Sequence, residues 1–599
     1  MSSAAGEASL LVGAGTTSRS PENSAAPSLR KSNARFRWEN SDNTVMQSWA
    51  GISFSSFSWK RFFFILSGAM LLVMLVASFD YGITWDEFIQ SHYGKLVLRY
   101  LATGGADQTC LVYPASMYLY GGLFDSLAVL AYGLFSGKLH EMIFYNVRQN
   151  FFQDGQLLYY FETRHALNAF FGFLAIFYTG LTAKELKGWK TACLASIMLF
   201  FSPRFFGNAM NNPKDIPFAA AAAFSLYFMV RYIRELPRPA LSTRLAIAAG
   251  IAAAINIKVG GVLFIGYFFL FAIGAWALDQ KSRAPLKLLR DLLLIAIVAY
   301  LGGLLFWPYG QRNPLINPFK ALTVFSSFTD AQGKMLFDGA QILQNQAPWY
   351  YLPKWILISS PFFFITGLFL FFMTARTLAR NCPVKILVML AFAGLFPVAY
   401  AILRKSVVYD SWRHFLFIYP PLVILAAAAW EQAFNFAQRN SHKIIVGLFF
   451  AFQFSHPVQW MLAHHPNAYV YFNPAAGGIQ GAFGRYETDY WGNCLRQASE
   501  WLSHHYLEGK PATPARIQAD GDVMSSSYYL IRRLGPLYRP APKGSAWDYR
   551  LALSRGLGPK ELLGGQWPPP GTIHRIQAEG VTLCAVVQNP EFKEVSKKS

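Results

Sequence analysis

The feature that most constrains this 599-residue chain is a series of long apolar stretches separated by short polar turns. A helix needs about 20 apolar residues to cross the hydrocarbon core of a bilayer. Only 14% of the residues are charged, whereas about a quarter is usual in soluble proteins. We predict an α-helical polytopic membrane protein with about 11 transmembrane helices, near residues 62–79, 165–183, 191–205, 215–233, 244–258, 260–278, 290–307, 355–375, 384–402, 414–431 and 443–460.

The distribution of Lys and Arg between these stretches predicts how the chain is threaded. Lys60 and Arg61 precede the first stretch, and every second loop carries far more basic residues than the loops between. Since basic loops stay in the cytoplasm, we expect the N-terminus inside and an odd number of spans. The apolar run 116–135 would reverse every later loop if it crossed, so we expect a helix lying in or re-entering the membrane interface.

Composition divides the chain into three predicted parts. Residues 1–58 are rich in Ser and Ala and predict a disordered cytoplasmic tail. Residues 59–460 form the predicted transmembrane domain, with large outer loops at 80–163 and 307–355. Loops of this length are uncommon without a task. Residues 461–599 lack apolar stretches and predict an extracytoplasmic α/β domain.

The predicted α/β domain contains a helical stretch at 495–505 and strand-like runs at 549–553 and 581–587. Two of the five cysteines, Cys494 and Cys584, fall within it. The sequence leaves open whether they form a disulfide, as an oxidising compartment favours, or remain free thiols. No cysteine or histidine spacing resembles a zinc site.

The net charge of +21 has a topological explanation, because the basic residues lie between apolar segments. No basic helix or aromatic–basic RNA motif is present, so we expect a membrane partner and no nucleic acid. The chain has no Asn-x-Ser/Thr sequon and no P-loop motif. We expect a multi-pass protein of the bacterial inner membrane.

Acidic residues stand at two predicted outer turns. Asp86 and Glu87 follow the first span, and Asp215 opens the fourth. Ionisable groups at the edge of a membrane usually serve a function or bind a partner. An equally open interpretation is that these acids cap helices, since acids favour helix N-termini.

Basic residues occupy the same predicted side of the membrane. Arg164 opens the second span, Lys214 precedes Asp215, and Lys258 lies between the fifth and sixth spans. Arg413 and His414 open a late span. An alternative interpretation of Lys258 is that its side chain only extends to the membrane interface, without serving a site. Together the acids and bases predict an outer pocket for an anionic phosphate substrate.

The order of these motifs resembles the GT-C membrane glycosyltransferases over roughly residues 60–435. The resemblance rests on Asp86-Glu after the first span, Asp215 at the mouth of the fourth, Lys258-Val-Gly-Gly after a short fifth, and Arg413-His-Phe-Leu-Phe-Ile-Tyr-Pro-Pro. The most similar group is the family-39-like enzymes, akin to protein O-mannosyltransferases and the lipid A aminoarabinose transferase. The later run Tyr486-Glu-Thr-Asp-Tyr-Trp-Gly is similar to bacterial members but suggests no task.

The resemblance implies a GT-C-like catalytic domain and a donor sugar linked through phosphate to a polyprenyl lipid. Asp86 matches the general base of an inverting transfer better than Asp80 or Glu87, and Glu87 or Asp215 would orient the acceptor or hold Mg²⁺ or Mn²⁺. The implied phosphate-binding residues are Lys258, Arg413, Arg164, Lys214 and His414. The sequence leaves open the metal, the sugar, and whether the acceptor is a glycan, a lipid or a protein.

Two other classes of function compete with this interpretation. A transporter or lipid flippase would show internal repeats and charges at the bilayer midplane, whereas the charges here gather on one predicted side. A protein that only anchors its C-terminal domain would leave the outer acids and bases without a role. The discriminating feature is spatial, because an enzyme needs Asp86 and Asp215 in one cavity.

Overall fold

Long apolar helices make up most of the computed structural model, which describes residues 58–144, 159–278, 284–326 and 333–592. The predicted tail lies outside these residues, Ser58 excepted. The chain from Trp59 onward forms one unit. Among the described residues, eight helices are long and apolar enough to cross a membrane: α1 (Trp59–Ser78), α6 (Tyr160–Lys187), α9 (Asp215–Glu235), η3 with α11 (Val259–Ala277), α16 (Phe362–Asn381), α17 (Val384–Leu403), η5 with α18 (Arg413–Phe436) and α19 (Asn440–Ala463).

The other three predicted spans are also helical but less regular. Helices α7 (Trp189–Phe200) and α8 (Pro203–Asn211) are bent by 70° and together pass as a ninth span. The bend follows from Pro203, because a proline disfavours helical geometry in the residue before it, and Ser202 is extended. Helix α10 (Leu241–Ile255) is short, and α12 (Pro285–Gly302) carries three charged residues near its start.

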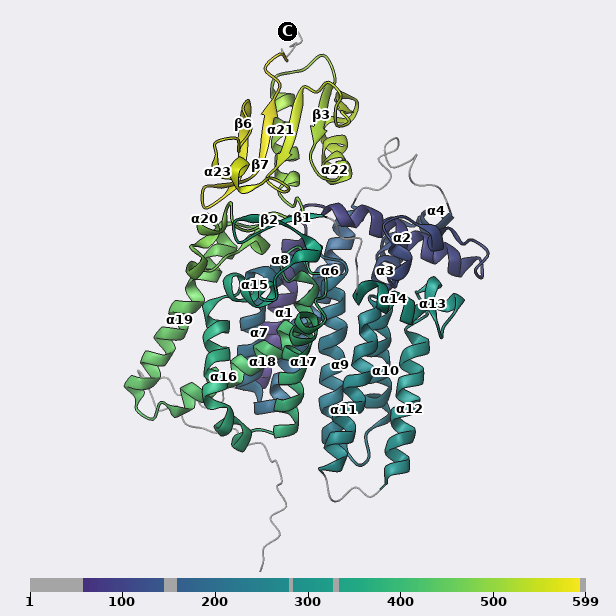
Figure 1. Cartoon of the computed structure of the whole chain (residues 1–599), viewed down its shortest axis with the longest axis vertical. Coiled ribbons are helices and arrows are strands. Elements are labelled where there is room, and N and C mark those ends of the chain that lie inside the picture. The colour runs from purple at the N-terminus through teal and green to yellow at the C-terminus, as the bar shows by residue number, and fades with distance from the viewer. Residues whose placement is uncertain (1–57, 145–158, 279–283, 327–332, 593–599) are drawn as a thin grey trace, which may run out of the picture. The chain divides into compact units, whose positions relative to one another are not determined.

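Helix α6 lies at the centre of the bundle and packs against α1, α7, α8, α9 and α18. Helices α9 and α18 are largely buried, whereas α1 and α19 are largely exposed, α19 at the edge of the bundle (Figure 1). The alanine runs 219–223 and 426–429 lie on these buried helices, and small residues allow such close approach. These helices confirm the predicted α-helical polytopic membrane architecture.

Short helices cover the end of the bundle that carries the C-terminal sheet (Figure 1). They include α3, which falls within the apolar run 116–135 and packs on α2 and α6. Its end is exposed and apolar at Leu134 and Phe135, so its place at the membrane interface stays a prediction. The short helices are α2 (Trp85–Ala102), α3 (Leu123–Ser136), α4 (Leu139–Phe144), α13 (Pro308–Arg312), α14 (Asn317–Ser326), α15 (Tyr351–Ser359) and α20 (Gly478–Ala482).

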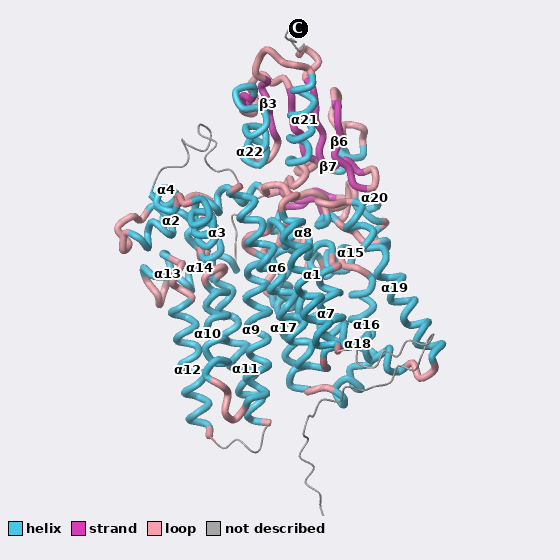
Figure 2. Tube along the Cα trace, turned by 180° about the vertical axis from the view of Figure 1, so that it is seen from behind, coloured by secondary structure: helices cyan, strands magenta, loops and turns pink. Residues whose placement is uncertain are grey.

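The chain after α19 ends in a five-stranded sheet of order β4-β3-β5-β7-β6. Strand β3 runs parallel to β4 and β5, and β7 runs antiparallel to β5 and β6. Figure 2 shows the strands gathered there, apart from the hairpin β1–β2. The strands are β1 (Lys334–Phe337), β2 (Ala340–Leu343), β3 (Ala515–Ala519), β4 (Tyr538–Pro540), β5 (Tyr549–Leu553), β6 (Thr572–Ala578) and β7 (Val581–Gln588).

Helices α21 (Leu495–Glu508) and α22 (Val523–Leu534) pack on this sheet, α21 against β5 to β7 and α22 against β3 and β4. A short helix, α23 (Pro559–Leu563), follows β5. These elements confirm the α/β character predicted for the C-terminal region. A disulfide joins Cys494 to Cys584, which settles the alternative that the sequence left open.

Candidate active site

Four separate turns of the chain meet around one cavity of about 280 Å³. Asp86 stands in the first turn of α2, Asp215 begins α9, Lys258 precedes η3 and Arg413 begins η5. Each of these turns lies at the same end of the helix bundle, beneath the C-terminal sheet (Figure 1). Segments more than 300 residues apart in sequence thus share one polar chamber.

Arg413 joins the two predicted acids. One guanidinium nitrogen lies 3.2 Å from Asp215 Oδ2, and the other terminal nitrogen lies 3.7 Å from Asp86 Oδ2. The same side chain stacks on the Trp491 ring with its centre 4.7 Å from the ring centroid. Because Arg413 is only 8% exposed, its charge acts in a medium that screens it weakly.

Asp215 is fully buried and surrounded by donors. Its Oδ1 pairs with the Lys258 ammonium and lies 3.6 Å from His414 Nδ1. Its Oδ2 accepts hydrogen bonds from Arg413 and, over 2.9 Å, from Asn212. A buried carboxylate needs such partners, so Asp215 is suited to arranging the cations and poorly placed to take a proton.

Asp86 has fewer charged partners than Asp215. Its side chain is 36% exposed and opens on the cavity, with Arg413 as its nearest cation. Desolvation of the carboxyl within the cavity raises the pKa of Asp86 above that of an ordinary carboxyl, although Arg413 opposes this shift. A carboxylate with a raised pKa is a better general base.

Two charged residues of the cavity, Asp410 and Arg555, were not predicted from the sequence. Asp410 lies between two arginines, 3.0 Å from Arg413 and 3.0 Å from Arg555. Burial alone would raise the pKa of Asp410, but Arg555 and Arg413 hold it below its ordinary value. Asp410 could have been predicted from its position three residues before Arg413. Arg555 follows β5, and no local sequence motif marks it.

Of the eight predicted site residues, Glu87 and Arg164 do not line the cavity. Glu87 caps α2, because its Oε1 accepts the Thr84 backbone N–H over 2.9 Å, and its Oε2 lies 3.1 Å from His165 Nε2. Arg164 lies 3.6 Å from Glu87. The capping alternative therefore describes Glu87, while Asp86, its neighbour, faces the cavity.

Lys214 lines the cavity and also contacts Asp125, which pairs with Arg164. Its ammonium lies 2.6 Å from Asp125 Oδ2, and Arg164 lies 2.5 Å from Asp125 Oδ1. Lys214 also donates to the Gly121 carbonyl over 3.3 Å. A side chain at Gly121 would collide with the Asn256 carbonyl, so this glycine lets the cavity wall approach the end of α10.

The motif that begins at Tyr486 forms a tight loop next to the cavity. Asp489 accepts backbone N–H groups from Trp491 through Cys494, for example Gly492 over 2.7 Å. Gly492 has a positive φ of 72°, which favours glycine. The loop sets Trp491 over Arg413. The sequence suggested no role for this motif, and in the structure it contacts Arg413 through Trp491.

An apolar groove of about 300 Å³ adjoins the cavity. Lys258, Tyr409 and His414 line both spaces, and the groove continues between residues of α11, α17 and η5 such as Leu263 and Phe396. One molecule with a charged head and an apolar tail could occupy the two spaces together.

The donor set of the cavity does not fit a divalent ion. Such an ion needs several oxygen ligands, but both oxygens of Asp215 contact cations, and Asp410 is shared between two arginines. Asp86 alone retains free coordination capacity. Among the described residues, the one metal-type group is Asp489 with Cys494 and Cys584, and those cysteines form the disulfide.

Comparison with known sequences bears on part of the chain. Residues 140–309 match the family described as "Dolichyl-phosphate-mannose-protein mannosyltransferase". The predicted resemblance is confirmed. The matched segment includes Asp215 and Lys258, and the family transfers a sugar carried on a lipid phosphate. No curated protein sequence matches the chain.

Two solved structures are similar to the chain as a whole. ArnT from Cupriavidus metallidurans bound to undecaprenyl phosphate is 13% identical, covering 88% of this chain and 98% of ArnT, with a TM-score of 0.43. AglB, the oligosaccharyltransferase from Archaeoglobus fulgidus in complex with an inhibitory peptide and a dolichol-phosphate, is 11% identical, covering 82% of this chain and 70% of AglB, with a TM-score of 0.41.

Proposed function

We propose that the protein transfers a sugar from a polyprenyl-phosphate donor to an acceptor hydroxyl, with inversion at the anomeric carbon. The observation that carries the proposal is the contact of Arg413 with both Asp86 and Asp215 in a cavity that continues into an apolar groove. The match of residues 140–309 to a lipid-phosphate-dependent family supports the same donor class.

In the proposed step, the acceptor oxygen forms a bond to the anomeric carbon while Asp86 takes its proton. The bond from the anomeric carbon to the phosphate oxygen breaks, and its electron pair leaves with the lipid phosphate. Arg413, Lys258 and His414, with Lys214 at the wall, offset the charge that develops there. Cations placed in a buried cavity stabilise such charge strongly.

The apolar groove would hold the polyprenyl chain, and the polar cavity its head group. Burial of apolar chain contributes about 0.8 kcal/mol for each CH₂ group. Donor binding can therefore come largely from the lipid, which leaves the charged side chains to act on the reacting atoms. Asp86 as base, Asp215 as organiser of the cations and the phosphate-binding roles belong to this proposal.

The C-terminal domain is proposed to lie outside the cytoplasm, and the protein in a bacterial inner membrane. The disulfide between Cys494 and Cys584 favours an oxidising side. The transporter alternative is less well supported, since the charged residues of the cavity gather at one end of the helices.

The test is transfer by purified protein in detergent or lipid discs from a panel of radiolabelled polyprenyl-phosphate sugars. Label should leave the lipid for an acceptor from a bacterial envelope extract in a time-dependent way. Release of no label from any donor, by protein that is folded, would overturn the proposal. Movement of intact donor between leaflets without cleavage would favour a flippase.

A further inference from the structure

Arg555 is a cation of the C-terminal domain that reaches the cavity between the transmembrane helices. It follows β5, and its neighbour Gly556 turns the chain with a positive φ of 84°. Its guanidinium lies 3.0 Å from Asp410 Oδ1 and stacks on the Trp85 ring at 4.2 Å. The side chain also donates to the Tyr490 carbonyl. Arg555 is thus held on three sides and is only 16% exposed.

Asp410 also contacts Arg413, which in turn contacts Asp86 and Asp215. Its other oxygen, Oδ2, accepts hydrogen bonds from Arg413, over 3.0 Å and 3.3 Å. Asp410 and Ser411 have positive φ values of 52° and 62°, a conformation that non-glycine residues adopt at a cost. The turn therefore needs partners that fix it, and the ion pairs with Arg413 and Arg555 provide them.

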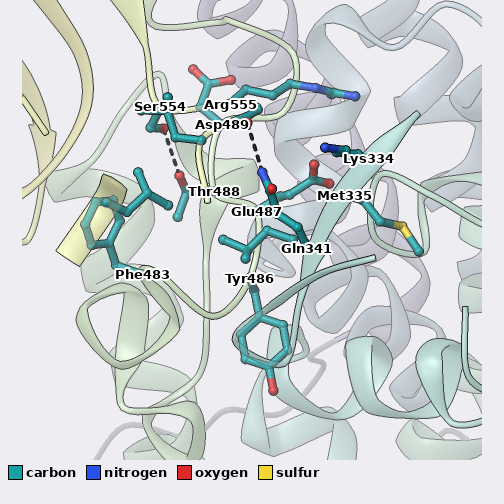
Figure 3. A pocket seen from close by; sticks show the side chains of 14 residues that line it. Lys334, Met335, Gln341, Phe483, Tyr486, Glu487, Thr488, Asp489, Ser554 and Arg555 are labelled. Carbon is teal, nitrogen blue, oxygen red and sulfur yellow. Dashed lines mark hydrogen bonds between the residues drawn. The ribbon is translucent and has the colours of Figure 1, made fainter. Parts of the chain in front are cut away.

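A second acid lies on the far side of Arg555. Glu487 and Arg555 line a small pocket of about 20 Å³, room for one water molecule (Figure 3). Burial raises the pKa of Glu487 to about 7, while Asp410 and Glu487 both stabilise the charged form of Arg555. Arg555 thereby separates two buried carboxyl groups that would otherwise repel each other.

We propose that Arg555 is a positioning residue for sugar transfer: through Asp410 it fixes Arg413 toward Asp86 and Asp215, so that the cavity is complete only with the C-terminal domain in place. The inference rests on the proposed function and assigns a task to residues 461–599. Among the described contacts Arg555 forms its ion pair in the cavity with Asp410 and none with Asp86 or Asp215, so we expect its positional effect to pass through Asp410.

A lysine cannot replace this arginine fully. A guanidinium is planar and donates in several directions, which suits the simultaneous contacts with Asp410, the Tyr490 carbonyl and the Trp85 ring. An ammonium would keep the charge near Asp410 but lose the stacking and the second donor. Partial rescue by lysine is therefore expected.

The test compares R555M, R555K, D410N and the double variant R555M/D410N in donor-to-acceptor transfer by the full-length protein. R555M keeps most of the apolar stem. Partners that orient metal ligands typically contribute about 10-fold to 100-fold, and by analogy we expect R555M to lower kcat by at least ~10-fold. KM for the donor should change little, because an interaction used in the transition state appears in kcat. R555K should lie between R555M and the wild type.

The double variant tests the route through Asp410. Residues that act in one chain of contacts are not additive, so R555M/D410N should be no slower than the slower single variant. The matched control is R516M, which removes another arginine of the same domain from an ion pair with Asp548, 2.6 Å long, and Arg516 lines neither the cavity nor the groove. Its kcat should equal that of the wild type.

The outcomes separate the two proposals. If the wild type releases no sugar from any donor, the proposed function fails. If the wild type transfers sugar and R555M keeps its kcat within twofold, the positioning role alone fails. Multiplied effects in R555M/D410N, or R555K at the wild-type rate, would also overturn it. Should R555M not accumulate, R555K and D410N carry the same comparison, with thermal unfolding as the check of folding.

Discussion

Arg413 donates a hydrogen bond to Asp215 over 3.2 Å and so joins the start of η5 to the start of α9. Both residues stand at helix ends that the sequence places almost 200 positions apart. The pair fixes a positive group in the cavity that adjoins the apolar groove.

Asp86→Asn should reduce sugar transfer by at least ~100-fold, since general base catalysis is typically worth about 10²–10⁴-fold. The amide cannot take the proton, yet it preserves size. The control is Asp80→Asn, because Asp80 is exposed and pairs with His465 outside the cavity. Single-turnover rates of the two purified variants make the comparison, and near-normal transfer by Asp86→Asn would remove Asp86 from its role.

The raised pKa of Asp86 gives a pH dependence with a definite sign. The base must be ionised, so kcat/KM should fall as the pH decreases through the pKa of this carboxyl. Because that pKa lies above the ordinary value, the decline should begin at a higher pH than an unperturbed aspartate allows. A pH–rate profile with donor below saturation measures it, and a flat profile down to pH 4 contradicts the assignment.

Lys258→Met should weaken both donor binding and transfer, because it leaves the buried Asp215 with one strong cation fewer and removes charge near the phosphate. The loss of one stabilising group of this kind commonly lowers kcat by about 10²-fold or more. Lys354→Met is a matched control, as Lys354 pairs with Asp338 and lines none of the spaces described. Equal rates for both variants would exclude a role for Lys258.

Leu263→Glu places a charge in the apolar groove and should raise the KM for long-chain donors. A donor with a two-isoprene chain loses contact with the groove in the wild type already, since each buried CH₂ contributes about 0.8 kcal/mol. The variant should therefore affect the short donor much less. KM values for the two donors, measured on both proteins, test the groove, and an equal rise for both chain lengths would place the lipid elsewhere.

Glu487 predicts how stability changes with pH. Its pKa is raised from 4.5 to about 7 in the folded protein, mainly by burial. The folded state therefore binds more protons than the unfolded state between these values, and this carboxyl reduces stability as the pH rises through that window. Glu487→Gln should be more thermally stable than the wild type at pH 8 and gain less at pH 5. A constant difference in Tm would contradict the assignment.

The sequence predicted the helices well because apolar length is a local property. All eleven predicted stretches coincide with helices, and the strand predicted at 549–553 agrees with β5. Boundaries failed where proline intervened, as at Pro203, which splits one predicted span into a bent pair. The residue types at Cys494 and Cys584 could not decide between thiols and a disulfide, which depends on the sheet that brings them together.

The cavity was harder to predict than the helices. Six of the eight proposed residues line it because they occupy turns between spans, all on one predicted side. Glu87 and Asp86 are neighbours, so sequence alone could not tell that one caps α2 while the other faces the cavity. Arg555 was not predicted because its contact with Asp410 depends on how a sheet distant in sequence packs on the helices.

Replacing Cys494 and Cys584 with serine should lower the stability of the C-terminal domain, typically by about 2–5 kcal/mol for a native disulfide. The bond closes a segment of 90 residues that includes Arg555. Thermal unfolding of the double variant and of the reduced wild type measures the change, and transfer should decline in parallel. Unaltered transfer after complete reduction would show that the domain holds its place without the bond.

Asn493, the residue before Cys494, accepts the Gly82 backbone N–H over 2.9 Å and a hydrogen bond from Asn211 over 3.0 Å. The short segment leading to Asp86 is thereby held by the residue next to the disulfide. Loss of the disulfide should therefore loosen the hydrogen bonds of Asn493 to Gly82 and Asn211, and with them the turn that positions Asp86.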